Sequence, residues 1–107
     1  MNTQFKKGIV EMCILSVVKK KDMYGFEVID TLSKEIDVNE NTVYPILRRL
    51  TGQGLFETYE KTTNVGAPRK YYKMTSLGLK KYEEYEHEWK AFLEGVFKLL
   101  GGLSHES

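Results

Sequence analysis

The stretch from Asn39 to Gly54, NENTVYPILRRLTGQG, constrains the fold of this chain most strongly. Its apolar residues recur at spacings of three and four, which predicts a short helix with one apolar face: Val43, Ile46, Leu47 and Leu50. Asn39 can cap the start of this helix, and the glycines that follow mark its end. The other side carries Asn41, Thr42, Tyr44, Pro45 and Arg48, which we predict to contact DNA together with the adjacent Arg49. A helix of this kind suits insertion into the major groove.

Pro45 lies inside this predicted helix and removes one backbone hydrogen bond, so we expect a kink or a short irregular turn there. Such a kink shifts the helical phase of the residues that follow. The sequence therefore leaves open whether Arg48 or Arg49 faces DNA.

Two helices are predicted before this stretch. The first runs from Phe5 to about Lys20, and the second from Tyr24 to Glu35 with Asp22 as its cap. Gly25 near its start permits the close approach of another backbone. A short linker joins the second helix to the third, which is the layout of a helix-turn-helix.

Two predicted strands follow, at residues 55–61 and 68–75, with a long flexible tip at residues 62–67. A basic hairpin after a helix-turn-helix is typical of a wing that reaches phosphates or an adjacent groove. The side chains that we predict on DNA outside the third helix are Lys61, Asn64, Arg69, Lys70 and, at a helix start, Tyr24. Tyr71 and Tyr72 point to opposite faces of a strand, so one is predicted in the core and the other on the surface.

A long final helix is capped by Thr75 or Ser76 and is expected to fray at Gly101 and Gly102. Seven apolar residues alternate spacings of three and four, as in the seam of a coiled coil: Tyr82, Tyr85, Trp89, Phe92, Val96, Leu99 and Leu103. This seam predicts a dimer contact, and the alternative is packing within the chain.

The net charge of +1 does not indicate a simple basic nucleic-acid binder, but its distribution is uneven. Residues 1–81 hold 14 lysines and arginines against 9 carboxylates, and residues 82–107 hold 2 against 6. This asymmetry is expected if one segment contacts phosphate and the other faces a partner or solvent. The single cysteine, Cys13, and the lack of a continuous apolar span predict a cytoplasmic protein that does not enter a membrane.

No catalytic constellation is present in the sequence. His87 and His105 stand apart, Cys13 lies in an apolar run, and no metal-ligand spacing or phosphate loop occurs. We therefore predict neither an enzyme nor a bound metal or cofactor.

Several motifs in this order resemble PadR-like transcriptional regulators of the short type, which have a single C-terminal helix. The matching residues are Gly8, Glu11 and Ile14-Leu15, then Tyr24-Gly25-Phe26-Glu27, Thr42 to Leu50, Gly54-Leu55, Gly66 to Thr75, and Gly78. The family often has glycine where this chain has Asn41, a difference that could alter base preference. The resemblance implies a winged-helix homodimer that represses transcription and sometimes releases DNA on binding a small molecule.

Trp89 is the strongest ligand candidate. In a two-fold dimer it would lie near its mate, and two indoles could sandwich a flat aromatic compound, as the resemblance suggests. The predicted pocket residues are Phe5, Ile9, Met12, Tyr85, Trp89 and Phe92. The alternative is a packed interface core, where aromatic residues are common.

Together these patterns predict an α+β, mainly α fold: a winged helix-turn-helix of three helices and a β-hairpin, with a long C-terminal dimerisation helix. Residues 1–75 would form the DNA-binding region and residues 76–107 the dimerisation helix, within one structural domain. The predicted function is that of a sequence-specific repressor on a pseudo-palindromic operator. The third helix of each subunit would enter one of two successive major grooves. The alternatives are a protein-protein interaction module without DNA binding and, more weakly, a small-molecule carrier.

Overall fold

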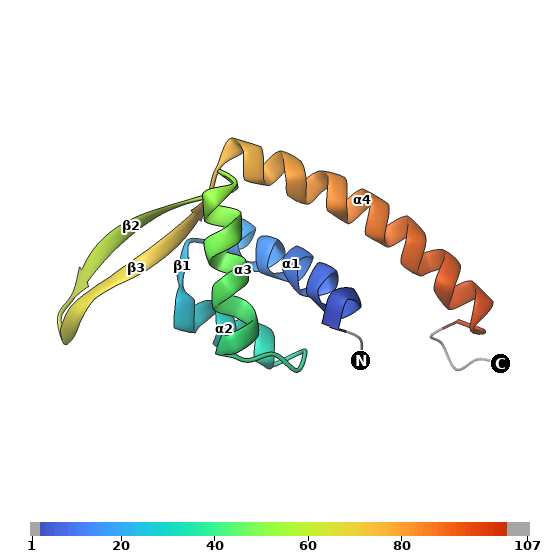
Figure 1. Ribbon diagram of the computed structural model, residues 1–107, viewed down its shortest axis with the longest axis horizontal. Helices are drawn as coiled ribbons and strands as arrows, with labels where there is room; N and C mark the ends of the chain where they lie inside the picture. The colour runs from blue at the N-terminus through green and yellow to red at the C-terminus, as the bar shows by residue number, and fades with distance from the viewer. Residues whose placement is uncertain (1–2, 103–107) are drawn as a thin grey trace.

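The computed structural model describes residues 3–102, with side chains from residue 7 onward. The elements in chain order are α1 Thr3–Lys20, β1 Met23–Tyr24, α2 Gly25–Ser33, α3 Glu40–Gly52, β2 Phe56–Thr63, β3 Gly66–Met74 and α4 Ser76–Leu99. Figure 1 shows the hairpin of β2 and β3 extending from one end of the helical body, while α4 extends toward the other. The mainly helical winged-helix fold is confirmed.

The core lies where the apolar faces of α1, α2 and α3 meet. Ile14 and Leu15 of α1, Val28 of α2, and Leu47 and Leu50 of α3 are all fully buried. Burying a side chain of this size contributes about 1.5–3 kcal/mol. The predicted apolar face of α3 is therefore the face that holds it to the body.

The start of α3 is capped as predicted, and the helix is continuous at Pro45, without the short irregular turn that was one of the two expectations there. The side-chain oxygen of Asn39 accepts hydrogen bonds from the backbone N–H groups of Asn41, at 2.9 Å, and Thr42, at 3.3 Å. The helix then continues through Pro45 to Gly52. Pro45 lies on the exposed face, and the buried residues on the opposite face hold the helix together despite the missing hydrogen bond.

The prediction that Asp22 caps α2 is wrong. Met23 and Tyr24 form the short strand β1, so the helix begins at Gly25, and its N-cap residue Tyr24 makes no side-chain capping bond. Asp22 instead accepts a hydrogen bond of 2.7 Å from the hydroxyl of Tyr59.

The three strands form an antiparallel sheet in the order β1-β3-β2. The hairpin is longer than predicted, and the long tip is wrong: only Asn64 and Val65 connect the strands. Lys61 pairs with Arg69 and Thr63 with Gly66, so Ala67 and Pro68 together face Thr62 in a bulge. A bulge tolerates a proline because the ladder there needs no N–H donor, which allows β3 to continue past Pro68.

The start of α4 lies against the end of the α3–β2 connection. The hydroxyl of Thr75 caps α4 by accepting a hydrogen bond of 2.9 Å from the N–H of Gly78. A Cβ at Gly78 would collide with the carbonyl oxygen of Leu55, so this close approach requires glycine.

The other end of α4 lies next to the predicted glycines, Gly101 and Gly102, where the helix ends in a cap. Gly101 and Gly102 have φ values of 96° and 85°, a conformation that favours glycine. Their N–H groups donate to the carbonyls of Lys98 and Phe97, which is the hydrogen-bonding pattern of a Schellman cap. Among the helices of residues 3–102, none is long and apolar enough to cross a membrane.

Candidate nucleic-acid interface

The outward face of α3 carries Asn41, Pro45 and Arg48. Spacings of four and three place these residues in one stripe, and all three are exposed. The stripe is opposite the buried residues that attach α3 to the body. The uninterrupted helix therefore establishes the phase that the sequence left open, and Arg48 is the arginine on the outward face.

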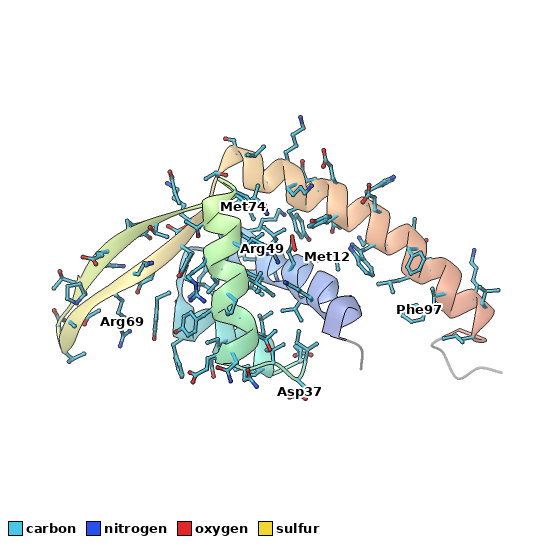
Figure 2. All side chains as sticks on the ribbon, viewed as in Figure 1. Met12, Asp37, Arg49, Arg69, Met74 and Phe97 are labelled. Carbon is cyan, nitrogen blue, oxygen red and sulfur yellow. The ribbon has the colours of Figure 1, made fainter. Side chains whose placement is uncertain are left out.

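Arg49 points in a different direction, toward α1 and α4. Its Nη1 lies 3.2 Å from Oε1 of Glu11, a carboxylate that is almost fully buried. The other oxygen of Glu11 accepts a hydrogen bond of 3.0 Å from the hydroxyl of Tyr85. Figure 2 shows Arg49 on α3, away from the wing. Because its guanidinium is engaged by Glu11, we remove Arg49 from the predicted DNA contacts.

The ring of Tyr44 lies over Gly25 at the start of α2. A Cβ at Gly25 would be 2.5 Å from a ring carbon of Tyr44, so this glycine admits a side chain and not the backbone that we expected. Tyr44 is half-buried and packs against the core. Thr42 is also half-buried, on the same flank of α3 as Arg49.

A shallow depression, here called the basic depression, lies where α3, the start of α2 and the base of the wing meet. Its lining residues are Tyr24, Gly25, Phe26, Tyr44, Arg48, Arg69, Lys70 and Tyr72. Its described side chains include three cations and no carboxylate. Positive charge concentrated on one concave surface attracts an anionic ligand such as the DNA backbone.

Phe26 was not predicted at this surface, although 62% of it is exposed beside Gly25. The residue stands within the Tyr24-Gly25-Phe26-Glu27 motif, which could have pointed to it. An exposed aromatic ring next to three cations adds apolar area for contact with a ligand.

The predicted wing residues Lys61, Asn64, Arg69 and Lys70 are all exposed. The guanidinium of Arg69 lies 4.4 Å from the ring centre of Tyr24, and Nζ of Lys70 lies 5.8 Å from that of Tyr72. Figure 2 shows Arg69 projecting from the hairpin. Asn64 lies at the tip, farther out than the basic depression.

Tyr71 and Tyr72 divide between the two faces of β3, as predicted. Tyr72 is buried and packs edge-on against Phe56, at 6.2 Å between ring centres. Burial raises the pKa of the Tyr72 hydroxyl. Tyr71 is half-buried on the outer face.

The first residues of the predicted apolar seam of α4 pack within the chain, whereas the later ones are exposed. Tyr82 and Tyr85 pack against the core of their own chain, and Trp89 lies over Gly8 of α1. Farther along α4, Phe92 is 60% exposed and Leu99 is 88% exposed. Val96 is partly exposed, and Leu103 lies outside the described residues. The distal half of α4 therefore presents an apolar face that the described part of this chain does not cover.

A groove of about 220 Å³ lies between α1 and α4. It is lined by Met12, Cys13, Ser16, Tyr82, Glu86, Trp89, Lys90 and Leu93. Figure 2 shows Met12 between the two helices.

The groove contains only part of the predicted ligand pocket. Met12 and Trp89 line it, and Phe92 lies edge-on to Trp89 at 6.1 Å between ring centres. Tyr85 is not in the lining and bonds Glu11 instead, Ile9 is half-buried outside the lining, and the side chain of Phe5 lies outside the described residues. No metal-binding group of histidine, cysteine, aspartate or glutamate occurs in the described part of the chain.

Comparison with known proteins gives consistent matches along most of the chain. A family model described as the transcriptional regulator PadR-like family matches residues 14–84. A solved PadR-like transcriptional regulator from Bacillus cereus is 35% identical, with a TM-score of 0.84 over 94% of this chain and 99% of its own.

Two further relatives agree with this match. A PadR-like transcription factor from Bacteroides fragilis is also 35% identical, with a TM-score of 0.77 over 91% of this chain and 95% of its own. An uncharacterised protein of Lysinibacillus sphaericus is 31% identical over 101 residues, which are 91% of this chain and 93% of that protein.

The adjacent arginines should differ in their effect on stability. Arg49→Ala leaves the Glu11 carboxylate without its cation, and we expect the free energy of unfolding to fall by about 1–3 kcal/mol. Arg48→Ala, the matched control on the exposed face, should change it by less than about 0.5 kcal/mol. Urea denaturation at one fixed protein concentration measures both, and equal losses would show that the ion pair with Glu11 does not support the fold.

Proposed function

This chain belongs to the PadR-like family of transcriptional regulators, and we propose that it acts as a homodimeric repressor of transcription on a pseudo-palindromic operator. Family membership makes it a DNA-binding regulator and confirms that it is not an enzyme. The observation that carries the proposal is the basic depression, where Arg48 of α3 and Arg69 and Lys70 of the wing meet without a carboxylate among the described lining residues.

In the proposed complex, α3 enters the major groove with its exposed stripe toward the bases. Asn41 can form a pair of hydrogen bonds with adenine, and Arg48 can do so with guanine. Pro45 would bring apolar surface against the base edges, with Thr42 and Tyr44 at the flanks of the stripe. Asn41 replaces a residue that is often glycine in the family, so it is the position at which we expect this chain to differ in base preference.

The wing supplies contacts that do not depend on the sequence of the DNA. Lys61, Asn64, Arg69 and Lys70 are exposed on the hairpin and would contact phosphates, together with Tyr24 at the base of the wing. Each phosphate neutralised by a cation contributes about one unit to the slope of log affinity against log salt.

Base reading and phosphate binding can be separated by two substitutions. Arg48→Ala should weaken binding to an operator selected from random DNA by about 1–3 kcal/mol, with a much smaller loss on random duplexes. Lys70→Ala should weaken binding to both DNAs alike and lower the salt slope by about one unit. Fluorescence anisotropy with labelled duplexes provides the measurement.

Equal losses for Arg48→Ala on operator and random DNA would exclude base reading by Arg48. Absence of binding by the unaltered protein to any duplex at low salt would instead favour the interaction-module alternative. Repression itself is inferred from resemblance to the family, and it predicts that the protein lowers transcription from a template carrying the operator.

The dimer is proposed to form through α4, with residues 1–75 as the DNA-binding region and residues 76–107 as the dimerisation helix of one structural domain. The exposed Phe92 and Leu99 support this assignment, because a second copy would remove their apolar surface from water. Tyr82 and Tyr85 anchor α4 on its own body, so the angle of α4 would set the distance between the two recognition helices. Major grooves on one side of DNA recur every 34–36 Å, so that distance selects the operator spacing.

A charge placed on the apolar face should separate the subunits. Phe92 is exposed in the single chain, so Phe92→Glu should leave the fold intact while it raises the dimer dissociation constant at least about tenfold. Ala91→Glu is the matched control, since Ala91 is exposed and lies about 100° around α4 from Phe92, outside the predicted seam. Light scattering over a concentration series measures the mass, and an intact Phe92→Glu dimer would contradict a contact through this face.

Release of DNA by a flat aromatic compound is the last element of the proposal, supported by the groove between α1 and α4. Trp89 is the single tryptophan of the chain and lines this groove, so its fluorescence reports on occupancy. Proflavine should quench it in a saturable manner and lower DNA affinity, and Ser16→Leu, which fills the groove, should abolish saturation. Unsaturable quenching, or quenching unchanged by Ser16→Leu, would favour the packed-core alternative.

A further inference from the structure

Three tyrosines from three different strands form one row across the outer face of the sheet. Tyr71 of β3 pairs with Tyr24 of β1 on one side and with Tyr59 of β2 on the other. The rings of Tyr71 and Tyr59 are stacked at 5.5 Å, with 12° between their planes, and Tyr24 meets Tyr71 edge-on at 5.5 Å. This set, here called the tyrosine row, lies on the face of β3 opposite the buried Tyr72.

The tyrosine row is tied to the body at both ends. Tyr24 is the N-cap residue of α2, and the hydroxyl of Tyr59 donates a hydrogen bond of 2.7 Å to Asp22. This hydrogen bond raises the pKa of the Tyr59 hydroxyl to about 12. The outer strand of the wing is thereby connected to the segment before β1 through aromatic side chains as well as through the sheet.

A pair of like charges lies directly beside the tyrosine row. Lys61 of β2 faces Arg69 of β3 in the antiparallel register, and like charges in this position destabilise a sheet. The neighbouring cross-strand pairs, Glu60 with Lys70 and Glu57 with Lys73, are of opposite charge. A repulsive pair in an otherwise complementary ladder becomes favourable once an anion binds between its members.

Each of these two cations lies over a ring of the tyrosine row. The guanidinium of Arg69 is 4.4 Å from the ring centre of Tyr24, and Nζ of Lys61 is 5.5 Å from that of Tyr71. None of the described ion pairs involves Lys61 or Arg69. The ring faces restrict two long side chains that would otherwise lose rotamer freedom on binding, and such restriction before binding favours affinity.

We propose that the tyrosine row is a positioning device that holds Lys61 and Arg69 as a two-cation clamp for one phosphate of the DNA backbone. This inference rests on the proposed DNA binding and adds to it a role for residues that need not touch DNA. Tyr71 is the central member, because its ring contacts both other tyrosines and lies beneath Lys61. Tyr71 is therefore a positioning residue that acts through the two cations.

Double-mutant cycles on operator DNA test this role. Tyr71→Leu should weaken binding about three- to tenfold, whereas Tyr71→Phe, which keeps the ring, should remain within about twofold of the unaltered protein. In a chain that already carries Lys61→Gln and Arg69→Gln, Tyr71→Leu should have no further effect. In an Arg48→Ala chain its full effect should persist, because Arg48 does not belong to the clamp.

Unaltered affinity of Tyr71→Leu, or the same loss in the Lys61→Gln/Arg69→Gln chain as in the parent, would overturn the clamp. A loss that Tyr71→Phe shares would also overturn it, because that variant keeps the ring. Urea denaturation establishes that each variant is folded. Should Tyr71→Leu not fold, the same cycles with Tyr59→Leu, at the exposed edge of the row, decide between the outcomes.

The failure of the clamp is distinguishable from that of the proposed function. Binding by the unaltered protein, with additive effects of Tyr71→Leu and the Lys61→Gln/Arg69→Gln pair, overturns the clamp and leaves the DNA-binding function in place. Absence of binding by the unaltered protein to any duplex at low salt overturns both.

Discussion

The buried carboxylate of Glu11 is the contact on which the arrangement of the helices depends. A charge removed from water is costly unless opposite charge and hydrogen bonds compensate it. Arg49 supplies the charge from α3, and Tyr85 supplies a hydroxyl from α4. Because Glu11 itself belongs to α1, this one group ties together α1, α3 and α4.

This contact also determines what remains available for binding. Arg49 and Tyr85 both contact Glu11 inside the chain. The outward surfaces of α3 and α4 are therefore formed by other residues of these helices. On α3 the exposed guanidinium is that of Arg48, which lines the basic depression together with Arg69 and Lys70 of the wing. On α4, Phe92 and Leu99 lie beyond Tyr85 and Trp89 and are exposed in the single chain. Any shift of α4 against α1 would act on α3 through the same carboxylate.

Much of the fold could be predicted because its signals are local. Val43, Leu47 and Leu50 mark the buried face of α3, and Asn39 and Thr75 cap helices where their side chains reach nearby N–H groups. One error arose where a distant segment competes for a residue. Asp22 was expected to cap α2, but β1 displaces the start of that helix and Tyr59 takes the carboxylate. At Pro45 a kink or a short irregular turn was expected, but α3 is continuous there, because burial of the opposite face outweighs one missing hydrogen bond.

The amino-acid sequence by itself determined the order of the elements, the apolar face of each helix and the presence of a basic wing after a helix-turn-helix. These properties follow from spacing along the chain, which repeats every few residues. Only the tertiary structure decided which of two adjacent arginines faces outward and which pairs with Glu11, which part of the α4 seam is internal, and that three tyrosines from separate strands stand in one row. Ion pairs and cross-strand contacts join residues far apart in the chain, so their partners emerge only when the elements pack together.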